Sequence, residues 1–215
     1  MNRFKKWQYQ MAAKQLIPVL TKKCYDAHYA ETLEEAKQIA LDMIPKGAKV
    51  AVGGSETLNQ MEMLEVFRSG DYNFVDRYVP NQTREEHHDL YRQGLTCDFL
   101  VTSTNAITRN AELVNIDSAG NRIAGMMYGP DRVIVIITAN KVCNTLEDAY
   151  RRAKACAPLN ALRWNHKTPC VETGVCCEEK CTTRDRMCNN IGIITNCQKH
   201  PQRISVIMVA DRAGF

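Results

Sequence analysis

The sequence of 215 residues lacks a long apolar run and a concentrated basic segment. No stretch approaches the roughly 18 apolar residues of a membrane-spanning helix, so we expect no membrane span. The basic and then amphipathic segment Met1–Trp7 lacks the apolar core of about 7–15 residues that a secretory signal needs, which predicts a cytoplasmic protein. No run of five Lys or Arg residues occurs and the net charge is only +4, which argues against nucleic acid as a partner.

Internal repeats and low-complexity linkers are also absent. Hydrophobic residues make up 45% of the chain and charged residues 24%, which is normal for a soluble globular protein. A chain of this length fits one domain of ordinary size with a small appendage.

Cysteine, in contrast, is plentiful: five of the ten cysteines lie between Cys170 and Cys188. Thiolates this close repel one another unless a cation or a covalent bond holds them, so an iron–sulfur cluster, a structural zinc and disulfides are the three alternatives. A cytoplasmic chain that can bury a full core does not need disulfides, which favours a metal. When the spacing is counted through Cys177, only Cys177 and Cys181 have the spacing of a zinc knuckle, and spacing alone leaves zinc and iron–sulfur open.

Apolar strand patterns alternate with amphipathic helical patterns along the chain. We expect strands at 48–52, 72–75, 98–102, 132–137 and 204–209. We expect helices over 2–24, 32–43, 83–93 and 146–156, and another that starts near Leu58. This alternation predicts an α/β fold with layers and a largely parallel sheet.

A β-hairpin and an inserted loop are expected to depart from this alternation. The hairpin would join a strand at 112–117 to a return strand at 122–127. The division into domains would then be an α/β domain of residues 1–165 and 201–215, interrupted by a cysteine-rich loop of residues 166–200.

The first candidate binding site is the glycine-rich turn that follows the strand at 48–52. Gly53 and Gly54 let the backbone approach a ligand closely, and a turn between a strand and a helix points backbone N–H groups at an anion. Ser55 and Thr57 add hydroxyl donors. The same sequence also fits a tight turn in which Ser55 only caps the helix.

The second candidate site is a group of polar residues near strand ends and the expected hairpin turn. They are Asn105, Thr108, Asn115, Asp117, Asn121 and Arg122. Asp117 and Arg122 are placed to pair across the hairpin. This crowding favours either a tightly bonded corner or a site, in which Asn105, Thr108 and Asn121 would contact an anion.

Lys141 lies just beyond the apolar strand at 132–137. Ligands of open α/β sheets bind beyond the carboxyl ends of the strands, so Lys141 is a candidate anion contact. We expect Asp117, Arg122 and Lys141 to carry any catalysis. His87 is interpreted as a surface or rim residue. His166 is interpreted as a solvated loop residue, and the alternative is a fourth metal ligand or a hydrogen-bond donor to a ligand.

Several segments together resemble the LUD-domain (lactate utilisation, DUF162) proteins, over a span from about residue 10 to Phe215. They are Ser103–Thr108, Leu113–Asp117, Gly120–Arg122, Gly129–Pro130, Asn140–Lys141 and Ala157–Asn160. The cysteine-rich tail resembles that of one subgroup of the family. Its matching motifs are Pro169-Cys170, Thr173-Gly174-Val-Cys176 and Arg186-Met-Cys188-Asn189.

This resemblance implies a fold like that of the sugar-phosphate isomerase and CoA-transferase group, and a [4Fe-4S] cluster on the tail, with zinc as the runner-up. The implied ligands are Cys170, Cys176, Cys181 and Cys188. The doublet Cys176-Cys177 departs from the family pattern, and Cys176 is chosen because it follows Thr173-Gly174 at the family spacing.

Three functions follow from these expectations. The first is an iron–sulfur protein linked to the oxidation or other conversion of lactate or another small carboxylate, in contact with redox partner proteins. The second is a non-redox enzyme of the isomerase or transferase type with a structural cluster or zinc, and the third is a redox-sensing binding protein. The amphipathic N-terminal helix leaves room for a homodimer, and the choice between an oxidoreductase component and a [4Fe-4S] lyase-like enzyme stays open.

Overall fold

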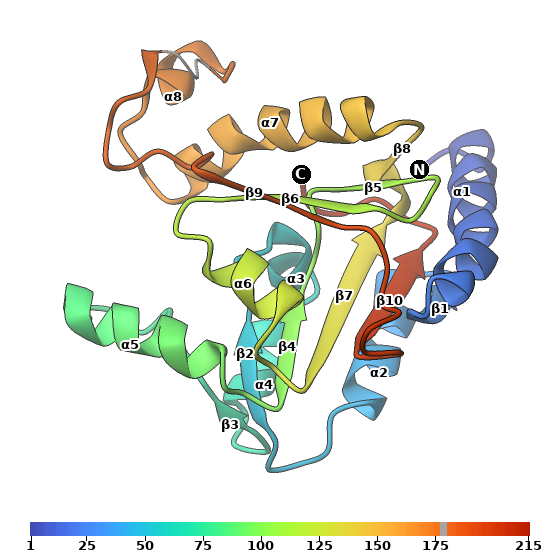
Figure 1. Ribbon diagram of the computed structural model, residues 1–215, viewed down its shortest axis with the longest axis horizontal. Coiled ribbons are helices and arrows are strands. Elements are labelled where there is room, and N and C mark those ends of the chain that lie inside the picture. The colour runs from blue at the N-terminus through green and yellow to red at the C-terminus, as the bar shows by residue number, and fades with distance from the viewer. Residues whose placement is uncertain (177–179) are drawn as a thin grey trace.

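A computed structural model describes residues 1–176 and 180–215, and in them a six-stranded sheet with parallel pairing forms the centre of the molecule (Figure 1). Its strands, in the order β1-β10-β7-β4-β2-β3, are β1 (Asp26–Ala30), β10 (Ile204–Val209), β7 (Arg132–Thr138), β4 (Phe99–Thr102), β2 (Lys49–Val52) and β3 (Asn73–Phe74). This confirms the predicted α/β fold with a largely parallel sheet and the five predicted strands. The edge strand β1 was not predicted.

A second sheet in the described part of the chain has four strands in the order β8-β5-β6-β9. They are β8 (Val142–Cys143), β5 (Ala106–Thr108), β6 (Leu113–Asp117) and β9 (Asn190–Ile194). Strand β6 pairs antiparallel with β5 on one edge and with β9 on the other. Because β9 belongs to the segment 166–200, part of the expected cysteine-rich insertion is built into this sheet.

The predicted return strand at 122–127 is wrong. Residues Asn121–Met127 form helix α6, and the hairpin joins β5 to β6 instead. The reason is local: the carboxylate of Asp117 accepts a hydrogen bond from the backbone N–H of Ile123 at 2.8 Å, in the first turn of the helix. Gly120, with φ of 83°, allows the chain to turn into the helix at this point.

The other helices surround the two sheets. They are α1 (Arg3–Lys22), α2 (Leu33–Asp42), α3 (Glu56–Gln60), α4 (Met63–Arg68), α5 (Arg84–Gly94), α7 (Leu146–Arg163) and α8 (Pro169–Thr173). The helices predicted over 32–43, 83–93 and 146–156 are confirmed at their starts. Thr32, Thr83 and Thr145 precede them, and each threonine side chain accepts a hydrogen bond from a backbone N–H of the first turn. The helix predicted from Leu58 is two short helices, since Glu62 adopts a positive φ of 53°.

Helix α7 is longer than predicted, because it continues through Pro158 to Arg163 instead of ending near Cys156. Its buried face includes Ala157, Pro158 and Ala161. Tertiary burial of this face therefore outweighs the local preference of proline for a helix end.

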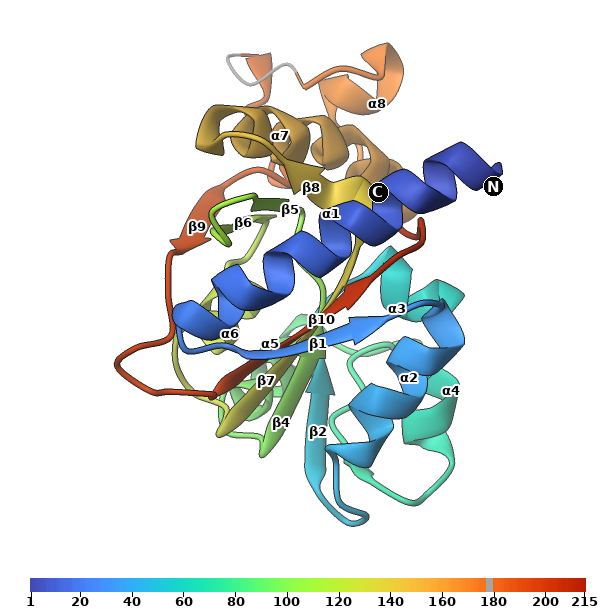
Figure 2. The ribbon, with the colours of Figure 1, turned by 90° about the vertical axis from the view of Figure 1, so that its right-hand side faces the viewer.

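Side chains of β7 alternate between the two faces of the main sheet. Val133, Val135 and Ile137 pack with the buried face of α1 and with the second sheet, whereas Ile134 and Ile136 pack with α2, α3 and α4. Figure 2 shows α1 and α2 on opposite sides of the sheet. Helix α7 covers the far side of the second sheet, where its alanines meet β5 and β6. Among the helices that the structure describes, none has the length and apolarity needed to cross a membrane.

Candidate active site

A cavity of about 210 Å³ lies where several strands end. It is lined by the turn after β2, the segment after β4, the end of β6, the residues after β7 and the last turns of α7. This is the position at which ligands bind to open α/β sheets. The volume is below the 300–1,000 Å³ typical of sites for drug-sized molecules, so the cavity suits a small metabolite.

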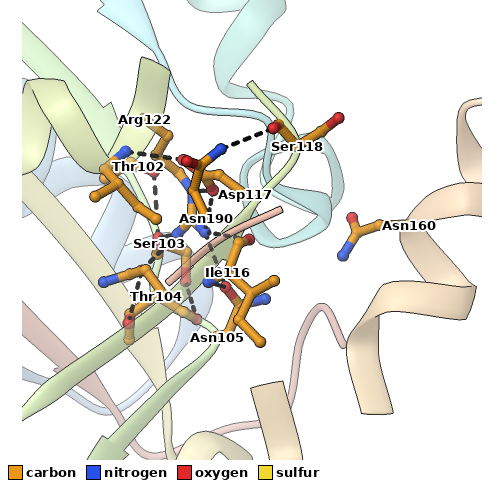
Figure 3. Close-up of polar contacts among 12 residues, drawn as sticks. Thr102, Ser103, Thr104, Asn105, Ile116, Asp117, Ser118, Arg122, Asn160 and Asn190 are labelled. Carbon is orange, nitrogen blue, oxygen red and sulfur yellow. Dashed lines mark hydrogen bonds and ion pairs between the residues drawn. The ribbon is translucent and has the colours of Figure 1, made fainter. Parts of the chain in front are cut away.

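The predicted polar corner forms one wall of this cavity, and Arg122 is its centre (Figure 3). The five N–H groups of Arg122 donate to the side chains of Asp117, Asn115 and Asn105 and to the carbonyl oxygens of Ser103 and Ile116. A guanidinium has five N–H donors, so none is left over for a ligand.

This saturation shows what Asp117 and Arg122 do in the fold. One carboxylate oxygen of Asp117 binds Arg122 and the other accepts from Ile123, which fixes the start of α6 against β6. Both side chains are buried, with 8% of each residue exposed. Of the two alternatives for this corner, the geometry favours a tightly hydrogen-bonded corner. Asp117 and Arg122 therefore position the cavity wall. Their predicted catalytic role stays a prediction.

Lys141 has a different environment. It is 3% exposed, and its Nζ donates to Thr57 Oγ1 and to Ser103 Oγ, at 2.8 Å each. Burial lowers the pKa of Lys141 to about 7, and the neighbouring Arg152 and Arg122 act in the same direction. The prediction that Lys141 lies at the site beyond β7 is thus consistent with its place in the cavity lining.

The glycine turn is arranged partly as predicted. Ser55 Oγ accepts a hydrogen bond from the N–H of Leu58, so it caps α3 as the simpler alternative supposed. The N–H of Gly53 donates to the carbonyl oxygen of Val101 at 2.9 Å and is not available to an anion. Gly53 lies outside the lining of the 210 Å³ cavity, while Gly54, Ser55 and Thr57 belong to it.

Two arginines that the sequence analysis did not select stand beside Gly54. A Cβ atom on Gly54 would come within 2.7 Å of an Arg77 nitrogen and 3.6 Å of an Arg163 nitrogen. Both guanidinium groups lie over the ring of Trp164, which itself stacks on Tyr78 with ring centroids 5.8 Å apart. Trp164 therefore holds the two arginines at the cavity.

The charges around the cavity do not balance. Its lining includes four Lys or Arg side chains and two Asp or Glu side chains: Arg77, Arg122, Lys141 and Arg163 against Glu56 and Asp117. Asp117 pairs with Arg122, and Glu56 lies 3.6 Å from Arg163. No carboxylate oxygen of residues 1–176 or 180–215 lies within 4.0 Å of the charged nitrogens of Lys141 or Arg77. Arg77, and Lys141 in its protonated form, thus have no carboxylate partner in the described protein, which is an environment suited to an anion.

Two histidines also line the cavity, His87 and His166. The ring Nδ1 of His166 is 2.8 Å from the carbonyl oxygen of Asp185, which can only accept a hydrogen bond. Nδ1 therefore carries a proton, and in the neutral ring Nε2 is a base. His166 lies in the loop after α7 and is partly exposed, as predicted, and it also joins the cavity wall to the cysteine-rich segment.

The remaining predicted contacts divide between the cavity and the turn of the β5–β6 hairpin. Asn105 and Asn121 line the cavity. Thr108 is buried in the hairpin turn, where its hydroxyl accepts from the N–H groups of Asn110 and Glu112, and it is outside the cavity lining. Its hydroxyl stabilises the turn, which supports a structural explanation for this residue.

The cysteine-rich tail packs on α7. The sulfur atoms of Cys176 and Cys188 are 4.0 Å apart, and Cys170 Sγ is 3.1 Å from Thr168 Oγ1. Cys170, Cys181 and Cys188 are buried, and all nine cysteines that the structure describes are free. Burial and the neighbouring Cys188 raise the pKa of the Cys176 thiol to about 11.

The tail is bonded directly to a wall of the cavity. Ser118, which follows Asp117 in the lining, donates its hydroxyl hydrogen bond to the carbonyl oxygen of Arg186 at 2.8 Å. The side-chain amides of Asn189 and Asn190 both donate to the carbonyl oxygen of Ser118. Residues on either side of Cys188 therefore hold the loop between β6 and α6.

Comparison with known proteins decides the family. The model of the LUD domain matches residues 13–209. The chain belongs to the LUD-domain family. This family is linked to lactate utilisation. The subgroup with an iron–sulfur tail stays an expectation.

The LUD domain of this chain has the fold of a solved relative. The crystal structure of a DUF162 family protein from Deinococcus radiodurans matches with a TM-score of 0.51 and 12% identity, over 94% of this chain and 98% of that one. At this identity the likeness shows the fold alone. Weaker matches are eIF2B delta from Chaetomium thermophilum (TM-score 0.34, 18% identity, 52% and 48% covered) and the eIF2B-beta2-delta2 complex of C. thermophilum (0.38, 16%, 82% and 55%). No curated protein matches the sequence.

The cysteines of the LUD-domain tail are the right type of ligand for a thiolate-bound cofactor, but their positions fit such a cofactor only in part. Cys176, Cys188 and Cys170 are electrostatic neighbours, and Lys154 beside Cys176 favours its thiolate. In residues 1–176 and 180–215, however, no three Cys, His, Asp or Glu side chains are gathered closely enough to hold one metal ion. Cys177, the alternative to Cys176, lies outside the described residues.

Proposed function

We propose that this LUD-domain protein binds a small carboxylate, such as lactate, in the cavity and carries a [4Fe-4S] cluster on its tail through Cys170, Cys176, Cys181 and Cys188. The observation that carries the proposal is the pair of cations, Lys141 and Arg77, without a carboxylate partner in the described protein, in a cavity whose wall is bonded to the tail.

The side chains of the cavity have distinct roles in this proposal. Lys141 and Arg77 bind the carboxylate by charge-assisted hydrogen bonds. Arg122 and Asp117 hold the wall in place, and Nε2 of His166 accepts the proton of a substrate hydroxyl. A bound cluster would supply electron transfer beside the cavity.

Zinc is the specific alternative for the tail. Two thiolates on one tetrahedral zinc, with Zn–S bonds of about 2.3 Å, are about 3.8 Å apart. The observed 4.0 Å between Cys176 and Cys188 is close to this value. A zinc site would make the tail structural and leave the cavity chemistry without an adjacent electron acceptor.

A titration of L-lactate into protein purified without oxygen tests the cavity. In the variant Lys141→Met, the loss of one charged hydrogen bond is expected to weaken binding about tenfold or more. Lys46→Met is the matched control, because this lysine is exposed and pairs with Asp71 at the surface. Equal lactate affinities in all three proteins, or no binding of L-lactate to the wild type, would contradict the assignment.

A further inference from the structure

Lys141 is an amine at the cavity wall with no carboxylate oxygen within 4.0 Å among residues 1–176 and 180–215. Its nearest polar partners are two hydroxyl groups, those of Thr57 and Ser103. The charges of Arg152 and Arg122 lower its pKa, and Cys156 acts in the opposite direction. An ammonium group in this place is destabilised both by the loss of hydration and by repulsion from the two arginines, whereas a neutral amine is not.

The two hydroxyl partners suit the neutral amine as well as the ammonium. A hydroxyl group both donates and accepts, so Thr57 and Ser103 accept from the ammonium and can donate to the lone pair of the amine. A carboxylate would stabilise the proton on Nζ, and these hydroxyls do not. Because burial lowers the pKa of Lys141 to about 7, the neutral amine with its free lone pair becomes accessible near neutral pH.

A buried amine of this kind is a nucleophile toward carbonyl carbon. We infer that Lys141 forms an imine with a small 2-oxo acid in the cavity. The lone pair of Nζ forms a bond to the carbonyl carbon, both hydrogens of the neutral amine pass to the carbonyl oxygen, and that oxygen leaves as water. The C=N bond replaces the C=O bond, and nothing is oxidised or reduced.

The carboxylate of the 2-oxo acid would meet the arginines beside Gly54. The Nε groups of Arg77 and Arg163 are buried and have no hydrogen-bond partner among the described residues, so both guanidinium groups have donor capacity to spare. The cavity of about 210 Å³ limits the ligand to a small molecule. This inference rests on the proposed function, because it assigns the same cavity to the same class of anion.

Reductive trapping with pyruvate tests the inference. Sodium cyanoborohydride reduces an imine to a stable amine, so the wild type is expected to gain one reduced pyruvate adduct, located by peptide mapping to Lys141. Lys141→Met is expected to lose this adduct, and Lys46→Met to retain it. The mapping on wild-type protein gives the answer even if Lys141→Met does not fold.

The pH dependence separates Lys141 from surface lysines. The neutral amine attacks, so trapping at Lys141 should rise from pH 6 to pH 8 and then level off, because its pKa is about 7. An ordinary lysine, with a pKa near 10.4, would still gain reactivity tenfold per pH unit over that range.

Two other outcomes would overturn the inference in different ways. The first outcome is either that adducts are spread over surface lysines, or that no adduct forms but pyruvate raises the Tm of the wild type and not that of Lys141→Met. This outcome would refute the imine and leave anion binding in place. Neither an adduct nor a rise in Tm with pyruvate or L-lactate would refute the imine and the proposed function together.

Discussion

At the scale of single residues, the cavity separates arginines that build the wall from cations that are free to bind. All five N–H groups of Arg122 donate hydrogen bonds within the protein. Lys141 and Arg77, in contrast, have no carboxylate partner among the described residues. Arg122→Ala would leave Asp117 buried without its cation, which is expected to cost about 3–5 kcal/mol of unfolding free energy.

Chemical denaturation measures this cost, with Arg151→Ala as the control. Arg151 is exposed and pairs with Glu147 on the surface of α7, so its loss should change stability by no more than about 0.5 kcal/mol. If the Arg122→Ala variant kept its stability but no longer bound the ligand, Arg122 would instead be a binding residue.

The sequence was informative about the residues that follow recognisable strands. Lys141 follows the most apolar strand, and Gly54 and Thr57 follow another, so strand ends alone predict that they meet. Arg77 and Arg163 could not be predicted in this way. They reach the cavity by stacking on Trp164, and contact between such distant segments is set by tertiary packing.

At the scale of elements, the loop between β6 and α6 connects the cavity to the tail. Its turn at Gly120 has φ of 83°, and an added Cβ would lie 3.3 Å from the side chain of Asn190, which bonds Ser118. Gly47 has almost the same φ, 82°, with nothing near its Cβ position. The two glycines thus share the backbone strain and differ in the contact with the tail.

Gly120→Ala and Gly47→Ala are both expected to lose about 1–2 kcal/mol of unfolding free energy from the left-handed backbone conformation. Only Gly120→Ala should lose more, and only it should weaken ligand binding, because the alanine displaces Asn190 from the loop. Urea denaturation and a lactate titration of both variants measure this. Identical losses in the two proteins would show that the loop and the tail are not coupled.

The β6–α6 region also shows why element types were harder to predict than their positions. The sequence after Gly120 fits a strand that returns from a hairpin as well as it fits a short helix. The deciding contact is the bond from Ile123 to the carboxylate of Asp117, together with the pairing of β6 to β9 some seventy residues later. Helix starts, in contrast, depend on capping contacts within one turn, and the starts predicted near residues 32, 83 and 146 are correct.

At the scale of the whole molecule, the tail and the α/β body form one unit. The tail contributes β9 to the second sheet, Met187 and the segment around His166 to the cavity, and its cysteines to the surface of α7. In the proposed function, a cofactor held by the tail would lie beside the cavity, because Met187 of the lining is next to Cys188. The pattern of cysteines predicted a cofactor, but spacing could not predict how the tail folds back on the body.

The most direct test of this account is the iron, sulfide and zinc content of protein purified without oxygen. We predict about four iron and four sulfide per chain, with the visible absorbance of a cluster, lost in Cys188→Ser and retained in Cys24→Ser, whose cysteine lies outside the tail. Stoichiometric zinc without sulfide would replace the cluster by a structural metal. Protein with neither metal, or a cluster that Cys188→Ser leaves undiminished, would contradict the assignment of the tail.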